Sequence, residues 1–332
     1  MLLERLCNAA SPSAYEGEMR EIIKSEIKDY VDEVKVDRMG NIVAHKEGTG
    51  KRILIDAHMD EVGFIITGYN EDGTLKFSSL GLVDSKVVPC KVVSLGEKRI
   101  PGVIGLKPVH LQTKEESEKN IQLSNLCIDI GAKSKEEARS IIPLGEYAVF
   151  TTRFEYFGEG LIKAKALDNR VGCSALIELL KEKYNCDLYG VFSVQEEIKD
   201  RGAYIPAYNI QSDIVLILEG TICADMPNVG ENLKVTKLKE GPAISIMDET
   251  SIFDSNIISE IKNIAVEKGI PYQIRKSTAG NNNGGSYIMN GDSTNVITLS
   301  VPSRYIHSSI SVCSIEDYEN TIRLAKEYLK SL

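Results

Sequence analysis

The run RILIDAHMD at residues 52–60 joins a strand to ionisable side chains. Residues 52–57 form a compact apolar run, which is typical of a strand that is buried on both faces of a sheet. His58 and Asp60 follow this run directly, and open α/β sheets bind ligands beyond the carboxyl ends of their strands. This stretch therefore predicts an α/β fold with a site at one edge of its sheet.

Strand and helix patterns alternate on both sides of this run. The predicted strands lie at residues 42–44, 189–194, 213–218 and 296–301. Apolar residues at helical spacing predict helices at residues 16–30, 171–180 and 257–265. A last helix begins near Ser314 and Asp317, which have capping-box spacing. We expect a mixed, largely parallel sheet flanked by helices.

Residues 68–157 have a different sequence pattern, without the alternation of strands and helices. Short β-rich pieces at residues 86–95 and 146–154 are separated by Gly and Pro, with a polar stretch at residues 113–120 among them. No obvious linker flanks this segment. We therefore expect a small β-rich domain inserted into a discontinuous α/β domain, which comprises residues 1–67 and 158–332.

The composition opposes several classes of function. The chain has 332 residues, 42% of them hydrophobic and 26% charged, as in ordinary globular proteins. A formal net charge of −9 argues against binding to nucleic acid and to anionic membranes. No apolar run approaches the roughly 20 residues of a membrane span, and we see no signal peptide. Seven scattered cysteines without a CxxC pair are typical of a reducing compartment, so we expect a cytoplasmic protein.

Further ionisable residues stand at the ends of predicted elements. Glu196, Glu197, Glu219 and His307 each follow a predicted strand, and Asp168 precedes a predicted helix. Each has a structural alternative when it is taken singly. A carboxylate can cap a helix, a Glu-Glu pair can be solvated, and a histidine can pack in a loop.

Together these residues form a mixed nitrogen and oxygen donor set without thiolates. Such a set suits Zn²⁺, Co²⁺ or Mn²⁺. The carboxylates of Asp168, Glu197 and Glu219, with one hydroxide, would balance the charge of two divalent ions. Without metal these carboxylates would repel one another in a confined site. The sequence therefore predicts a site for two divalent metal ions, with Zn²⁺ or Co²⁺ expected first.

Several strings in the chain resemble metallopeptidase family 42, the dinuclear aminopeptidases that assemble into hollow tetrahedral particles. The resemblance spans nearly the whole chain, in the right order, and its motifs together are highly specific. The matching strings are AHMDEVGF at 57–64, GVIG at 102–105, IDIGA at 128–132, KALDNR at 165–170, VQEE at 194–197 and PSRYIHS at 302–308.

The resemblance implies a zinc-peptidase-like fold and a role for each candidate ligand. Asp168 would bridge two metal ions. His58 and Glu219 would complete one metal site, and Glu197 and His307 would complete the other.

The resemblance also implies the catalytic residues and the assembly. Glu196 would be the general base, and Asp60 would accept a hydrogen bond from the imidazole of His58 and fix its orientation. The inserted domain would be the family's dimerisation domain. Self-association through it would produce a dodecamer.

Three positions depart from the family pattern. Glu219 stands where the family usually has Asp, and Ile222 replaces a usual His. The stretch GNNNGG at residues 280–285 replaces a Gly-rich Thr-Asp-Ala motif that lies near the substrate in relatives. This loss of a carboxylate is expected to weaken recognition of basic side chains, an effect that Asn283→Asp would test.

We therefore expect a metallo-aminopeptidase that acts on peptides with a free N-terminus. Fold-related metallo-carboxypeptidases and deacylases use nearly the same metal ligands and form one alternative. A glycoside hydrolase is a second, because paired carboxylates can perform that chemistry, although the chain has no Trp for sugar stacking. A non-catalytic assembly protein is a third, motivated by the Asn-rich loop.

Overall fold

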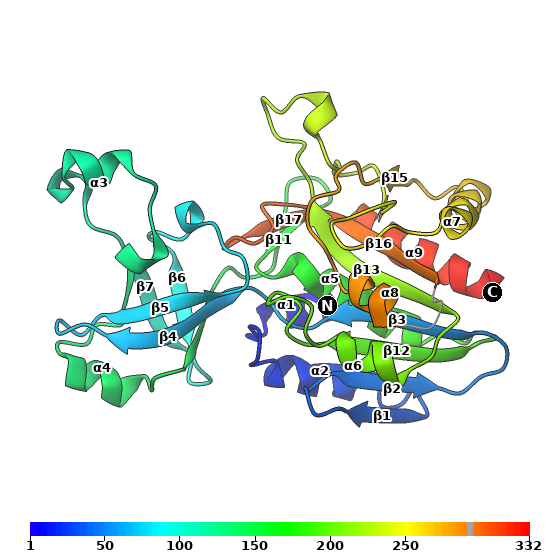
Figure 1. Cartoon of the computed structure of the whole chain (residues 1–332), viewed down its shortest axis with the longest axis horizontal. Helices are drawn as coiled ribbons and strands as arrows, with labels where there is room; N and C mark the ends of the chain where they lie inside the picture. The colour runs from blue at the N-terminus through cyan, green and yellow to red at the C-terminus, as the bar shows by residue number, and fades with distance from the viewer. Residues whose placement is uncertain (291–294) are drawn as a thin grey trace.

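The structure is a computed structural model that describes residues 1–290 and 295–332, apart from the side chains of residues 116 and 117. A large α/β domain carries a small closed β-barrel (Figure 1). Each has its own hydrophobic core, the first built around the central strands and the second inside the barrel. None of the helices in the described ranges has the length and hydropathy that a membrane span requires.

The large sheet is mixed, with a parallel centre and antiparallel flanks. Its central strands run parallel because helices connect them, whereas the outer strands pair antiparallel. The prediction of a mixed, largely parallel sheet is thus confirmed for the core of the fold. In spatial order the strands are β1 (Glu33–Val36), β2 (Ile42–Lys46), β12 (Asp187–Ser193), β3 (Arg52–His58), β13 (Ile214–Ile222), β16 (Asn295–Arg304), β17 (Ser311–Ser314), β11 (Leu161–Ala164) and β10 (Glu155–Phe157). Two short strands, β14 (Ala243–Ile244) and β15 (Gln273–Ile274), extend it beside β16.

The central strands have apolar sequences because their side chains are buried. All side chains from Ile53 to Ala57 in β3 are fully buried, including the carboxylate of Asp56. Helices pack against this centre, and α5 contacts both β3 and β13. The helices of the large domain are α1 (Leu2–Asn8), α2 (Gly17–Ile27), α5 (Leu167–Leu180), α6 (Tyr204–Asn209), α7 (Ser255–Glu267), α8 (Gly284–Asn290) and α9 (Ile315–Ser331).

The start of α9 realises only half of the predicted capping box. The Ser314 hydroxyl accepts a hydrogen bond from the backbone N–H of Asp317 at 3.4 Å. The Asp317 carboxylate, however, accepts hydrogen bonds from the backbone N–H groups of Lys239 and Gly241, at 2.7 and 2.8 Å. This carboxylate therefore fixes a distant loop to the helix rather than closing the box.

The barrel holds six strands around an aromatic core. The Phe64 ring meets the rings of Phe77 and Phe150 edge to face, at centroid distances of 5.1 and 5.3 Å. In spatial order the strands are β4 (Gly63–Tyr69), β5 (Leu75–Leu80), β8 (Cys127–Asp129), β7 (Ile100–Gly105), β6 (Val92–Leu95) and β9 (Tyr147–Phe150).

The strands of the barrel begin and end earlier than the predicted segment 68–157. They run from Gly63 to Phe150, and β10 pairs with β11 in the large sheet. Within the barrel, the β-type run predicted at residues 86–95 starts with a 3₁₀ turn and becomes a strand only at Val92. The polar stretch at residues 113–120 contains a short helix, α3 (Lys114–Glu118).

Candidate metal centre

The candidate ligands meet at the carboxyl ends of the parallel strands. His58 is the last residue of β3, Glu196 and Glu197 begin the loop after β12, and His307 follows β16. Glu219 lies inside β13 rather than after it, which corrects the predicted strand end. The strand continues because its parallel pairing with β16 runs on to Ile222.

Asp168 lies in the first turn of α5 but does not cap it. Its φ and ψ angles are not helical, and its neighbour Ala166 has a left-handed φ of 56°. The side chain turns toward both histidines instead. Its Oδ1 lies 3.3 Å from Nε2 of His58, and its Oδ2 lies 3.1 Å from Nε2 of His307.

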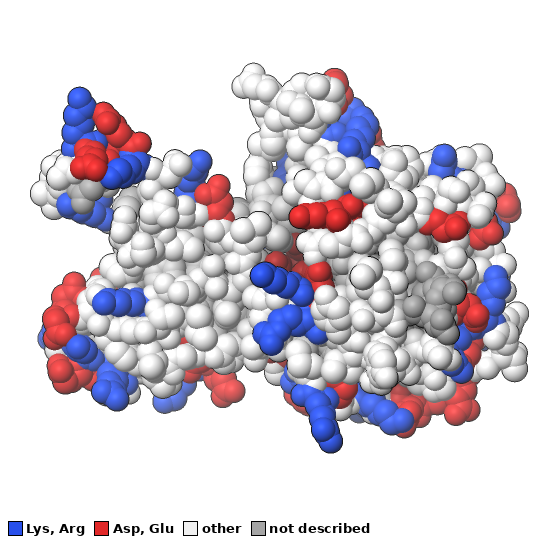
Figure 2. Space-filling model, viewed as in Figure 1, with Lys and Arg blue, Asp and Glu red and all other residues white. Residues whose placement is uncertain are grey.

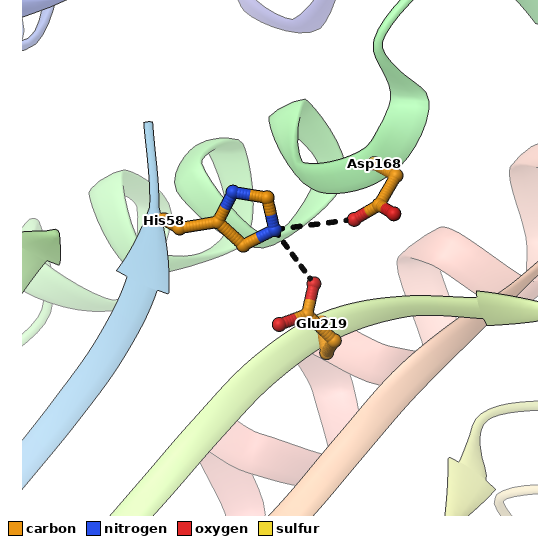
Figure 3. Close-up of side chains that lie close together, drawn as sticks. All are labelled: His58, Asp168 and Glu219. Carbon is orange, nitrogen blue, oxygen red and sulfur yellow. Dashed lines mark hydrogen bonds and ion pairs between the residues drawn. The ribbon is translucent and has the colours of Figure 1, made fainter. Parts of the chain in front are cut away.

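The side chains form two groups that share Asp168. In the first, Nε2 of His58 also lies 3.3 Å from Oε1 of Glu219, so one imidazole nitrogen faces two carboxylates (Figure 3). In the second, Nε2 of His307 lies 3.3 Å from Oε2 of Glu197. Within each group the donor atoms lie within 4.8 Å of one another. The structure thus brings together all five residues that the sequence singles out as metal ligands.

Glu196 is also close to this centre. Its Oε2 lies 3.7 Å from Nε2 of His58, and with His58 and Glu197 it forms a third group of compatible donors. The distance between Glu196 and His58 therefore does not tell whether Glu196 binds a metal ion or acts as a base. The third group differs from the first two in one respect, because it does not include Asp168, which faces both histidines.

The carboxylate of Asp60 contacts several residues of the candidate metal centre. Its buried carboxylate lies 3.4 Å from Nδ1 of His58 and accepts a 2.6 Å hydrogen bond from the hydroxyl of Ser13. It also accepts hydrogen bonds from the backbone N–H groups of Glu196 and Glu197, at 3.0 and 3.2 Å. Asp60 therefore holds the backbone of both glutamates and lies against one imidazole, although Nδ1 of His58 forms no hydrogen bond with any described residue.

A second buried carboxylate, Glu16, extends this support. It accepts a hydrogen bond from the backbone N–H of Gln195 at 3.2 Å, so two carboxylates hold three successive amides of the loop. Glu16 and Ser13 were not predicted from the sequence. Both residues lie far along the chain from residues 195–197, so no local sequence pattern links them to that loop. Their burial, which is unusual for polar residues, becomes visible only in the fold.

The centre concentrates negative charge in a buried place. Burial raises the pKa of Glu197 to about 8 and that of Glu219 to about 7. Burial, and next the nearby charge of Glu219, raises the pKa of Glu196 well above its usual value. Burial lowers the pKa of His307, but the carboxylates of Glu197 and Asp168 outweigh it and raise that pKa to about 9. Burial and the closeness of these ionisable groups to one another cause the shifts.

The donor atoms fit divalent metal ions. Oε1 of Glu197 and Oε2 of Glu219 are buried and accept no hydrogen bond from any described residue. Buried carboxylate oxygens of this kind are costly unless a cation or a donor compensates them. Imidazole nitrogen and carboxylate oxygen without thiolate is the donor set of Zn²⁺, Co²⁺ and Mn²⁺ sites.

A cavity of about 430 Å³, the inner cavity, opens onto these groups. The carboxylates of the centre line this cavity, as do Arg275, Asp248, Asn281 and Asn282. Arg275 is already engaged, because its Nε donates to the Thr221 hydroxyl at 3.0 Å and its guanidinium also donates to the carbonyl of Ala279. In Figure 2, Asp and Glu atoms lie in the hollow between barrel and large domain.

Asn283 does not face this cavity, so the predicted effect of that position on basic side chains is not supported. Its side chain is fully buried and donates hydrogen bonds to Asp56 and Ser193, both at 2.7 Å. Asn281 and Asn282 line the cavity instead. The Asn-rich loop therefore turns its third Asn inward, toward the central sheet.

Comparison with known proteins gives the same family over nearly the whole chain. A profile of the M42 glutamyl aminopeptidase family matches residues 40–324. A putative aminopeptidase of Acetivibrio thermocellus is 36% identical over 330 residues, which cover 98% of this chain and 97% of that protein.

Solved structures agree in fold along the full length. The TET aminopeptidase of the marine sediment archaeon Thaumarchaeota archaeon SCGC AB-539-E09 has a TM-score of 0.96 and 32% identity, covering 100% of this chain and 95% of its own. The TET1 peptidase of Pyrococcus horikoshii, described as assembling into a tetrahedron or a large octahedral shell, has a TM-score of 0.89 and 32% identity. That match covers 100% of this chain and 99% of the other.

Proposed function

Because the chain belongs to the M42 glutamyl aminopeptidase family, we propose that its metallo-aminopeptidase reaction uses two divalent metal ions and Glu196 as the general base. One observation carries the proposal. The two oxygens of Asp168 face different histidines, and each of these histidine nitrogens also has a glutamate oxygen 3.3 Å away, from Glu219 and Glu197 respectively. A single carboxylate shared by two such groups suits a bridging ligand.

Each metal ion would have its own set of protein ligands. Asp168 would bridge, His58 and Glu219 would hold one ion, and Glu197 and His307 would hold the other. When bound, two divalent ions supply Lewis-acid polarisation of the scissile carbonyl and make the attacking water more acidic. Zn²⁺ or Co²⁺ is the first expectation for both ions, and Mn²⁺ also suits the donors.

Glu196 would move the proton. Its side chain lines the inner cavity beside both groups, and Asp60 holds its backbone through a 3.0 Å hydrogen bond. From this position the carboxylate would accept a proton from the attacking water and deliver it to the leaving amine. Such general acid–base catalysis contributes typically about 10²–10⁴-fold to the rate.

Peptides with a free N-terminus are the proposed substrates, in the cytoplasm. The carboxylates around the inner cavity suit a positively charged amine. All seven cysteines are free thiols, as expected in a reducing compartment. An acetylated N-terminus would remove that charge, so hydrolysis of an acetylated peptide as fast as its free-amine counterpart would favour the deacylase or carboxypeptidase alternative.

Removing the metal ions is expected to abolish activity and lower the melting temperature. The buried carboxylates then lose their compensating charge, and a ligand at 100 times its Kd stabilises a fold by about 2.7 kcal/mol. Elemental analysis before and after chelation, with calorimetry and adding back of Zn²⁺, Co²⁺ or Mn²⁺ separately, measures both effects. Saturation at one ion per chain would contradict the dinuclear centre.

The barrel is proposed to join subunits. Light scattering is expected to give particles well above 36.6 kDa, in the range of dodecamers. The strands β4 and β9 that begin and end the barrel pair directly, with Phe64 opposite Ala148, so a short turn can replace the barrel. Its separate core predicts that the remaining domain folds and dissociates. A full-length protein that stays monomeric at all concentrations would contradict this role.

A further inference from the structure

A second cavity, the outer cleft, continues from the inner cavity. It measures about 680 Å³ and lies between the segment at residues 82–91 of the barrel and the loop around Ile310 of the large domain. Both cavities are lined by the same four residues at their junction, namely Leu82, Ile222, Ile306 and His307. A peptide bound at the candidate metal centre can therefore extend directly into the outer cleft.

Large apolar side chains are exposed along this route. Leu82 is 77% exposed, Tyr305 47% and Ile222 45%. All three line the outer cleft, although they come from three segments that are far apart in the sequence. Exposed apolar side chains that converge in a cleft mark a binding surface more often than scattered ones do.

The two cavities have opposite charge. The candidate metal centre gives the inner cavity its carboxylates, whereas the outer cleft is lined by Lys86, Lys91 and a single acidic residue, Asp84. The Asp84 carboxylate accepts a 2.9 Å hydrogen bond from the backbone N–H of Lys86. Neither lysine ammonium forms an ion pair with any residue that the structure describes. Both are thus available to an anion in the cleft.

We propose that the outer cleft binds the residues after the scissile bond, and that Lys86 and Lys91 bind a carboxylate of that part of the peptide. The proposal rests on the proposed function, because it takes the scissile bond to lie at the centre. The carboxylate is either the C-terminus of a short peptide or an acidic side chain. The converging apolar side chains would contact the intervening residues.

Kinetics with matched substrates test this assignment. The substrates are leucyl-glycyl-glycine with a free C-terminus, its C-terminal amide, and leucyl-coumarin, which has no residue that could reach the lysines. The variants are Lys86→Met, Lys91→Met and both together. Lys98→Met, in the exposed turn between β6 and β7 and outside the cleft, is the matched control.

The wild type is expected to have a lower KM for the free acid than for the amide. The double variant should raise KM for the acid by about 3- to 10-fold relative to leucyl-coumarin, as partly exposed charge contacts allow, while kcat changes little. The control should keep the wild-type ratio of acid to amide. A double variant that keeps both this ratio and the ratio of glutamyl to glutaminyl peptide compared next would overturn the proposal.

Two further arms separate the possible outcomes. Comparing leucyl-glycyl-glutamyl amide with the glutaminyl amide shows whether the bound carboxylate is a side chain, and lysine-dependent preference for either carboxylate supports the cleft. Calorimetric binding of both matched pairs, the acid with the amide and the glutamyl with the glutaminyl peptide, to the Glu196→Gln variant tests the cleft without turnover. Equal affinities within both pairs would overturn the assignment. Failure of the wild type to hydrolyse any member of a panel of aminoacyl-coumarins would contradict the proposed function instead.

Discussion

Replacing Glu196 by Gln is expected to lower kcat by roughly 10²–10⁴-fold while both metal ions stay bound, because the substitution removes a proton acceptor and keeps size and polarity. The backbone N–H of residue 196 still donates to Asp60, so the loop should keep its place. Substrate affinity should change little. Steady-state kinetics combined with elemental analysis of the variant measure the two quantities separately.

Glu197→Gln is the matched comparison. Glu197 lies in the same loop, but its Oε2 lies 3.3 Å from Nε2 of His307, and it also forms a group of donors with Asp168 and His307. Its loss should weaken one metal ion, so part of the activity should return at high metal concentration. The Glu196→Gln variant should gain nothing from added metal. Near-normal turnover of Glu196→Gln with full metal content would show that the base is another group.

The sequence located the site well because its signals are local. A strand buried on both faces must be apolar, and the ionisable residue that ends such a run stands out from it. His58 and His307 were found in this way, at or after the strands of a parallel sheet whose carboxyl ends share one edge. Asp168 needed the resemblance, since a carboxylate before a helix is equally typical of an N-cap.

Strand ends and hydrogen bonds that depend on contacts between distant segments could not be predicted from the sequence. The strand through Glu219 continues because β16 pairs with it, and that pairing leaves no periodic signal. The Asp317 carboxylate binds amides of a loop about 80 residues away in the chain instead of its own helix end. Glu16 supports the loop at residues 195–197 across a gap of 179 residues in the sequence. In each case the partner is set by packing rather than by spacing.

Asn283 illustrates the same limit at a functional motif. From the sequence alone, an Asn where relatives carry Asp suggests the loss of a negative charge near the substrate. In the fold that Asn donates to Asp56, which also accepts hydrogen bonds from Ser193 and Tyr287, at 2.9 and 2.7 Å. The buried cluster already holds one carboxylate. The amide at position 283 therefore donates a hydrogen bond to that charge.

This pairing predicts that Asn283→Asp destabilises the protein strongly rather than changing its preference for lysyl over leucyl substrates. It would place two carboxylates in hydrogen-bond contact at a site with no exposed surface. An uncompensated buried charge costs about 3–5 kcal/mol. Urea unfolding of the variant measures this loss, and Asn281→Asp, in the same loop but facing the inner cavity, is the matched control, expected to change stability much less.

The exchanged pair, Asp56→Asn with Asn283→Asp, separates this mechanism from a general intolerance of the loop. It keeps one carboxylate and one amide in contact, with Ser193 able to donate to the new Asp and Tyr287 to the new Asn. If charge repulsion causes the loss, the double variant should recover most of the stability, since residues in one hydrogen-bond network are strongly non-additive. A double variant as unstable as the sum of its two single changes would show that the shape of the site, and not its charge, requires Asn283.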